Sequence, residues 1–194
     1  MSTSSRAGAW IFVAAVGAAV ASAAVLGLMQ RWDGMLRFAA VTVVLLLTRR
    51  AKVPTGFVAA FSVLVLLAMW GSVQHWYARI PHFDTLVHVL TPGSLAAVSY
   101  FLLVDARLLP DARARDRALR EWAPVLWVTL TGSVAAVLWE YYEWVVEQIS
   151  PQGMLVGYTD TVVDLFAGMC GSWVAGLLVL RWAGRGNRSV HDRS

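Results

Sequence analysis

The sequence contains few charged residues and only one cysteine. Charged residues make up 14% of its 194 residues, whereas a typical soluble domain has about 25%. The single cysteine, Cys170, excludes an internal disulfide. Hydrophobic residues make up 58% of the chain, compared with about 45–50% in soluble domains. These proportions exclude a disordered chain, a soluble enzyme and a secreted disulfide scaffold, and they indicate a membrane protein.

The motifs of several common enzyme classes are also missing. The sequence has no phosphate-binding loop, no nucleotide-binding glycine fingerprint, no paired-cysteine zinc spacing and no Ser-His-Asp constellation. The net charge of +4 would indicate nucleic-acid binding in a soluble domain. Here the basic residues lie between apolar stretches, so we expect them to set membrane topology and expect no nucleic-acid partner.

Long apolar runs dominate what remains. A helix needs about 20 residues to cross the hydrocarbon core of a bilayer, with about 17–25 as the working range. The runs predict an all-α, polytopic membrane protein of about six transmembrane helices, with one domain over residues 1–183 and a basic cytoplasmic tail over 184–194. The predicted helices span residues 9–29, 33–48, 55–73, 84–104, 122–146 and 160–182.

The first apolar run also resembles a secretory signal peptide. Arg6 precedes it, and the small residues 21–23 have the composition of a cleavage site. The apolar run nevertheless continues to Met29, which favours a retained transmembrane helix. Cleavage would leave five membrane spans and would not change the orientation of the others.

The lysine and arginine residues predict the orientation. If the N-terminus is cytoplasmic, thirteen of the 16 basic residues fall on the cytoplasmic side, and only Arg31, Arg37 and Arg79 fall on the outer side. The positive-inside rule therefore places both termini in the cytoplasm. The second predicted helix is short, and we expect Trp32 and Arg37 to reach the interface from it.

Acidic residues gather at one end of the last three predicted helices. In the predicted orientation this end is the outer one, and its acids are Asp84, Glu140, Glu143, Glu147, Asp160 and Asp164. Residues three or four apart share a helix face, and this spacing joins Asp84 to His88. It also joins Glu140 to Glu143 and Asp160 to Asp164.

Carboxylates in such a position need a compensating positive charge. A charged side chain deep in the bilayer costs about 2.5–3.5 kcal/mol on the insertion scale, and neighbouring carboxylates also repel one another. Either a bound cation or protons must therefore neutralise the cluster. Acids within a membrane usually mark a functional site for this reason.

A metal ion is the leading hypothesis. Carboxylates with one imidazole suit Mg²⁺, Mn²⁺, Fe²⁺ or Zn²⁺, and helix bundles hold such ions with Glu and His from facing helices. The predicted metal ligands are Asp84, His88, Glu140, Glu143, Asp160 and Asp164. Glu143 is also the candidate catalytic residue, as a general base, and His82 is a further candidate ligand. The ion would serve hydrolysis or transfer on a lipid or lipid-linked substrate by activating water or polarising a phosphoryl oxygen.

Two other functions remain open. Chains of Asp, Glu and His relay protons in transporters, so a proton- or cation-coupled carrier is the alternative. The acids are shallow and lie on one side only, which favours a site open to the outer face over a pathway through the membrane. The third interpretation is a non-catalytic membrane protein whose acidic cluster is structural.

Three segments of the chain resemble a known family. Residues 82–88 (HFDTLVH) resemble the Tyr-Asp-x-x-Gly-His segment of the YjdF-type bacterial inner-membrane proteins. Residues 139–144 (WEYYEW) resemble their Glu-x-x-Glu-Trp segment, and residues 160–164 (DTVVD) resemble their Asp-Thr-x-x-Asp segment. Order and spacing agree over about residues 55–182, although Val87 stands where the family has glycine before the histidine.

This resemblance implies a fold and a location but no reaction. It implies the six-helix layout and a multi-pass position in the bacterial inner (plasma) membrane, with the lipid bilayer as partner. It also points to the same six candidate ligands. The wider group is similar to VanZ-like membrane proteins, which are linked to glycopeptide resistance, but that distant likeness carries no function to this chain.

Overall fold

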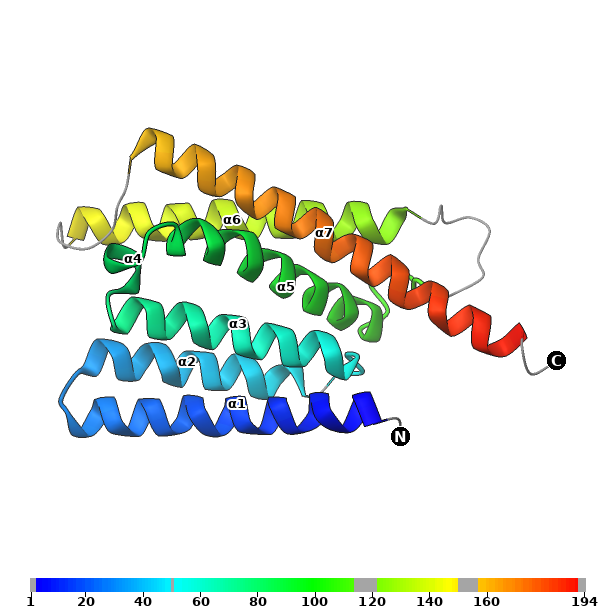
Figure 1. Ribbon diagram of the computed structural model, residues 1–194, viewed down its shortest axis with the longest axis horizontal. Coiled ribbons are helices and arrows are strands. Elements are labelled where there is room, and N and C mark those ends of the chain that lie inside the picture. Colours follow the sequence, from blue (N-terminus) through cyan, green and yellow to red (C-terminus); the bar gives the residue numbers. More distant parts are fainter. Residues whose placement is uncertain (1–2, 50, 114–121, 150–156, 192–194) are drawn as a thin grey trace. The chain divides into compact units, whose positions relative to one another are not determined.

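The described part of the chain is helical. The computed structural model describes residues 3–49, 51–113, 122–149 and 157–191, and all regular secondary structure in these ranges is α-helix (Figure 1). The helices are α1 (Thr3–Leu28), α2 (Trp32–Thr48), α3 (Thr55–Val73), α4 (Trp76–Arg79), α5 (Phe83–Asp105), α6 (Ala123–Ile149) and α7 (Tyr158–His191). Five of them, α1, α3, α5, α6 and α7, are long and apolar enough to cross a membrane. The prediction of an all-α membrane protein is thus confirmed.

The described residues form five helices of spanning length where six membrane spans were predicted, and the difference is α2. This helix has 17 residues, which at 1.5 Å per residue reach about 26 Å, while the hydrocarbon core is about 30 Å thick. The membrane crossing of α2 therefore stays a prediction. Helix α4 was not predicted, because a single turn of 4 residues is too short to show a hydrophobic period.

The observed helix boundaries agree best with the predicted ones where an apolar run is clearly bounded at both ends. Helix α3 has the predicted bounds of residues 55–73. Helix α7 differs most, because it begins at Tyr158 and continues to His191, whereas its apolar run ends at Trp182. The residues after Gly184 are mostly polar but include no proline, and the helical backbone extends into the predicted tail.

The chain forms two compact units, Met1–Phe83 and Asp84–Ser194. In the first unit, α1, α2 and α3 pack side by side (Figure 1). Trp70 of α3 donates a hydrogen bond of 3.0 Å to the Ser22 hydroxyl of α1. Phe38 and Leu45 of α2 are fully buried. The expectation of a single transmembrane domain stays a prediction.

Two arginines of the first unit hold the C-terminal end of α3. Arg31 donates a hydrogen bond to the carbonyl oxygen of Val73 at 3.1 Å, and Arg37 donates one to the Ser72 hydroxyl at 2.6 Å. The C-terminal end of a helix favours positive charge. Arg37 thus binds near the C-terminal end of α3, and its reach to the membrane interface stays a prediction.

In the second unit, α5, α6 and α7 meet at small residues. Three pairs make these contacts: Gly93 with Gly171, Ala96 with Gly132, and Ala136 with Gly168. A Cβ atom on Gly93 would lie 2.6 Å from the carbonyl oxygen of Gly171, which is too close for any side chain. Small residues let helix backbones approach closely in membrane bundles. The backbones of α5 and α7 therefore lie close together at Gly93 and Gly171, near the helix ends that carry the acidic residues.

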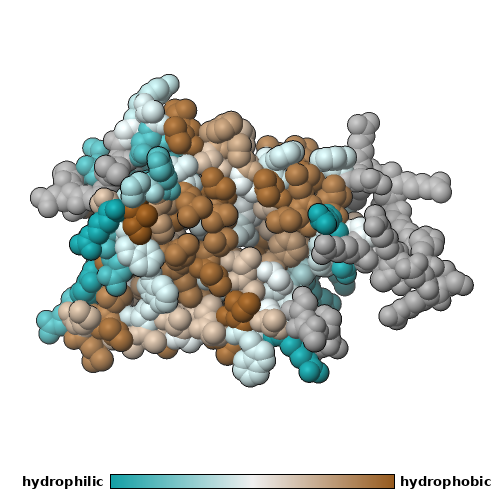
Figure 2. Space-filling model, viewed as in Figure 1, coloured by the Kyte–Doolittle hydropathy of each residue, from teal (hydrophilic) through white to brown (hydrophobic). Residues whose placement is uncertain are grey.

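Apolar side chains also cover the outside of the long helices. Figure 2 shows hydrophobic residues over the middle of the helices and hydrophilic residues gathered towards their ends. Exposed apolar residues include Leu46, Val63, Leu138 and Phe166. Lipid tails solvate such surfaces, and the helical backbone satisfies its own hydrogen bonds within the bilayer.

Candidate metal centre

Three helix ends carry the candidate ligands. Asp84 and His88 lie in the first two turns of α5, Glu140 and Glu143 lie near the C-terminal end of α6, and Asp160 and Asp164 lie near the N-terminal end of α7. Each pair is three or four residues apart and therefore shares one face of its helix. All six residues belong to the second compact unit.

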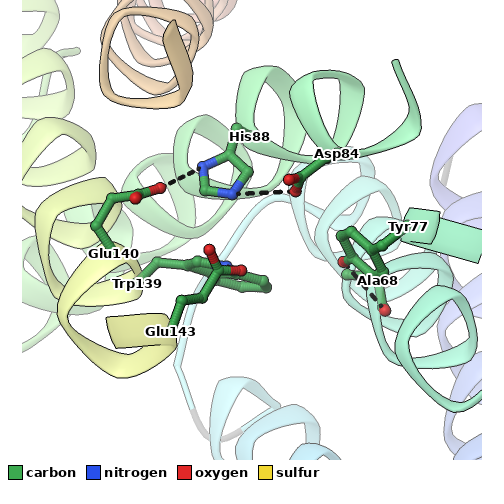
Figure 3. A network of polar contacts seen from close by, with 7 residues as sticks. All are labelled: Ala68, Tyr77, Asp84, His88, Trp139, Glu140 and Glu143. Carbon is green, nitrogen blue, oxygen red and sulfur yellow. Dashed lines mark hydrogen bonds and ion pairs between the residues drawn. The ribbon is translucent and has the colours of Figure 1, made fainter. Parts of the chain in front are cut away.

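His88 lies at the centre of the cluster (Figure 3). Its side chain is only 1% exposed. The Nε2 atom lies 3.4 Å from Oδ1 of Asp84, and the Nδ1 atom lies 3.6 Å from Oε1 of Glu140. The imidazole thus faces a carboxylate on each side, one from its own helix and one from α6.

Trp139 contacts two of the candidate ligands. Its indole Nε1 donates a hydrogen bond of 2.7 Å to Oε1 of Glu143. Its ring packs edge-to-face against His88, with the ring centroids 5.7 Å apart. No role for Trp139 was predicted, although its position one helical turn before Glu143 was a usable signal.

Several buried polar atoms of the cluster have no hydrogen bond within the described residues. They are Oδ1 of Asp84, both ring nitrogens of His88, Oε1 of Glu140 and Oδ1 of Asp164. A buried polar group without a hydrogen bond costs about 1–3 kcal/mol, and a charged group costs more. Four of these atoms face one another in the two His88–carboxylate pairs, so either a proton on the imidazole or a bound cation would satisfy them.

The ligand atoms form three overlapping groups. In each group all three atoms lie within 4.8 Å of one another; the groups are Asp84–His88–Glu143, His88–Glu140–Asp164 and Asp84–Asp160–Asp164. Ligands of one ion lie about 2.0–2.6 Å from it, so two of them are separated by at most about 5 Å. The structure thus brings the six candidate ligands into three overlapping groups of three, and the spacing within each group is compatible with one ion. Metal binding by these residues stays a prediction.

Two other candidates do not join these groups. Glu147 is half-buried one turn beyond Glu143, and its Oε2 atom has no hydrogen bond among the described residues, but it is in none of the three groups. His82 is exposed and belongs to the first compact unit, so the structure gives no support for it as a ligand.

Comparison with known proteins identifies a family. No curated protein and no solved structure matches the chain. A family model described as "Predicted membrane protein (DUF2238)" matches residues 4–185, a range that includes every candidate ligand. This match does not extend to the YjdF-type name or to the VanZ-like relationship, which stay predictions. With nearly its whole length covered, the chain belongs to this DUF2238 family of membrane proteins.

Proposed function

We propose that this multi-pass membrane protein binds a divalent cation between the ends of α5, α6 and α7. The ligands are drawn from Asp84, His88, Glu140, Glu143, Asp160 and Asp164. The observation that carries the proposal is a buried imidazole, 1% exposed, between carboxylates of two helices and without a hydrogen bond. Imidazole with carboxylate is a ligand set for Mn²⁺, Fe²⁺ or Zn²⁺, and a site richer in carboxylates suits Mg²⁺.

Charge supports the same proposal. Glu140 and Glu143 are each 9% exposed and Asp164 is 2% exposed. Carboxylates that are withdrawn from water and placed side by side repel one another more strongly than they would in water. A divalent cation among them offsets this repulsion and satisfies the buried oxygens without requiring a further protein group.

We also infer a reaction class for the site. The cluster lies towards the ends of its three helices, so the substrate that we propose is one whose headgroup lies at the membrane surface. A bound cation would polarise a phosphoryl oxygen or activate water there. The indole N–H of Trp139 donates a hydrogen bond to Oε1 of Glu143. The second carboxylate oxygen of Glu143 would then accept a proton as general base. The substrate is accordingly a lipid or lipid-linked compound at the outer face of a bacterial inner membrane.

Metal analysis of the purified protein tests the proposal. The full chain is purified in detergent without chelator, its metal content is measured, and the measurement is repeated after exchange into Mg²⁺, Mn²⁺, Fe²⁺ and Zn²⁺. We expect stoichiometric metal in the wild type and a loss of about tenfold or more in Asp164→Asn, because the change removes a ligand and a charge. Asp105→Asn is the matched control, because Asp105 is exposed at the other end of α5.

The outcomes separate the candidate functions. A wild-type protein that binds none of the four ions would overturn the proposal. Uptake into vesicles that depends on a pH gradient would then favour the proton- or cation-coupled carrier. Without metal and without transport, the structural role of the acidic cluster would remain.

A further inference from the structure

We infer that the cluster binds two divalent cations, one in an inner and one in an outer position. The inner position is formed by His88, Glu140 and Asp164, and the outer position is formed by Asp84, Asp160 and Asp164. This inference rests on the proposed function and specifies how many ions the site takes and which residues hold each.

The two ring nitrogens of His88 face different carboxylates. A neutral imidazole has one nitrogen with a free lone pair, and its other nitrogen is a donor. Nδ1 faces Glu140 at 3.6 Å, on the side of the inner position, so it is the ligating nitrogen. Nε2–H then points at Oδ1 of Asp84, 3.4 Å away. A carboxylate in this place fixes the tautomer and orientation of a metal-bound histidine.

Asp164 links the two positions. It belongs to both the inner and the outer group, and a carboxylate has two oxygens that can bind different ions. Its side chain is 2% exposed, so both oxygens are held inside the helix bundle. Two-metal centres place their ions about 3.5–4 Å apart, a separation that one carboxylate can bridge.

Charge also favours two ions over one. The three groups contain five carboxylates and one histidine. With a neutral imidazole, one divalent cation leaves three negative charges uncompensated, and two cations leave only one. In a poorly hydrated site, each uncompensated charge is costly. The second cation removes most of the remaining repulsion.

The two positions differ in their access to water. All three residues of the inner position are buried, whereas Asp84 and Asp160 of the outer position are half-buried. The outer cation should therefore bind more weakly and exchange faster. Its ligand Asp160 lies in the first turn of α7, so it can be changed with little effect on the packing of the helices.

A Mn²⁺ titration of the chelator-treated full-length protein tests this inference. Bound ions are counted by equilibrium dialysis, and spin coupling between them is measured by electron paramagnetic resonance. We expect two Mn²⁺ ions per wild-type chain with a coupled signal. Asp160→Ala should retain one ion, with the coupling lost, and the Asp105→Ala control should retain two coupled ions.

The possible results distinguish this inference from the function on which it rests. One uncoupled Mn²⁺ ion per wild-type chain would overturn the two-ion arrangement and leave the proposed cation site intact. No bound Mn²⁺ in the wild type would overturn the two-ion arrangement. If Mg²⁺, Fe²⁺ and Zn²⁺ also fail to bind, the proposed function is overturned as well. Two coupled ions in Asp160→Ala would contradict the assignment of Asp160 to the outer position.

Discussion

At the scale of single residues, the cluster depends on how His88 and Glu143 are held. His88 is held between Asp84 and Glu140, and Glu143 is held by the indole of Trp139. The edge-to-face contact of that indole with His88 restricts both candidate ligands through one side chain. Groups that orient metal ligands in this way are often as necessary as the ligands themselves.

Replacing Trp139 with phenylalanine tests this role. Trp139→Phe removes the N–H that binds Oε1 of Glu143 but retains an aromatic ring beside His88. Loss of an orienting group typically costs 10–100-fold in metal affinity, and we expect a loss of about this size in a Mn²⁺ binding titration. Trp144→Phe is the control, because Trp144 is exposed on the same helix. Equal affinity in the two variants would show that Trp139 does not position the site.

The sequence predicted the candidate ligands but not their arrangement. Spacing of three or four residues identifies which side chains share a helix face, as for Asp84 with His88 and for Asp160 with Asp164. It does not identify which carboxylate faces which ring nitrogen, because that depends on how α5 and α6 rotate against each other. The contact between Trp139 and Glu143 depends on side-chain rotamers, which the spacing also leaves undetermined.

At the scale of the helices, glycines set the distance between α5 and α7. A Cβ atom on Gly171 would clash with the carbonyl oxygen of Val89 on α5, only one residue after His88. A Cβ atom on Gly168 would lie 3.5 Å from the carbonyl oxygen of His88 itself. The approach of α7 to α5 that brings Asp164 to His88 thus depends on residues without side chains.

Gly171→Ala should therefore separate the two helices. We expect it to lower the free energy of unfolding by about 1–3 kcal/mol, the usual cost of overpacking, and to weaken cation binding as well. Thermal unfolding in detergent measures the first effect. Gly184→Ala is the matched control on α7, because a Cβ atom there meets nothing within 4 Å. Identical midpoints for the two variants would contradict the close contact at Gly171.

The helices themselves were predictable to different degrees. The apolar run of α3 is bounded by Pro54 and by Gln74, so its ends matched the prediction. The C-terminal end of α7 was not predicted, because the apolar run ends at Trp182 while the backbone remains helical to His191. The length of a helix depends on backbone hydrogen bonds, whereas the apolar pattern reports only the part that avoids water.

At the scale of the whole molecule, cation binding should stabilise the fold. A ligand that binds only the native state raises its stability, by about 2.7 kcal/mol at a free concentration of 100 times the Kd. Chelator should lower the thermal midpoint at about pH 7.5, and the effect should shrink towards about pH 5, because protons compete with the metal for histidine and carboxylate ligands. A midpoint that chelator leaves unchanged at both pH values would argue against a resident ion.

Topology is a second property of the whole molecule that can be tested. Because thirteen basic residues fall on one side and three on the other, we predict that a cytoplasm-active reporter fused after Gly184 gives signal. A fusion near Gln152, which lies outside the described residues, should give none. The opposite pattern would reverse the orientation and move the acidic cluster to the cytoplasmic face.

Anomalous diffraction from crystals of the full-length protein grown with Mn²⁺ tests the central claim most directly. We predict an anomalous peak between α5, α6 and α7, within about 2.0–2.6 Å of the nearest His88 nitrogen and Asp164 oxygen. The peak should be missing from crystals of Asp164→Asn grown in the same way. A well-ordered cluster without an anomalous peak at a saturating Mn²⁺ concentration would contradict the claim that these residues form a cation site.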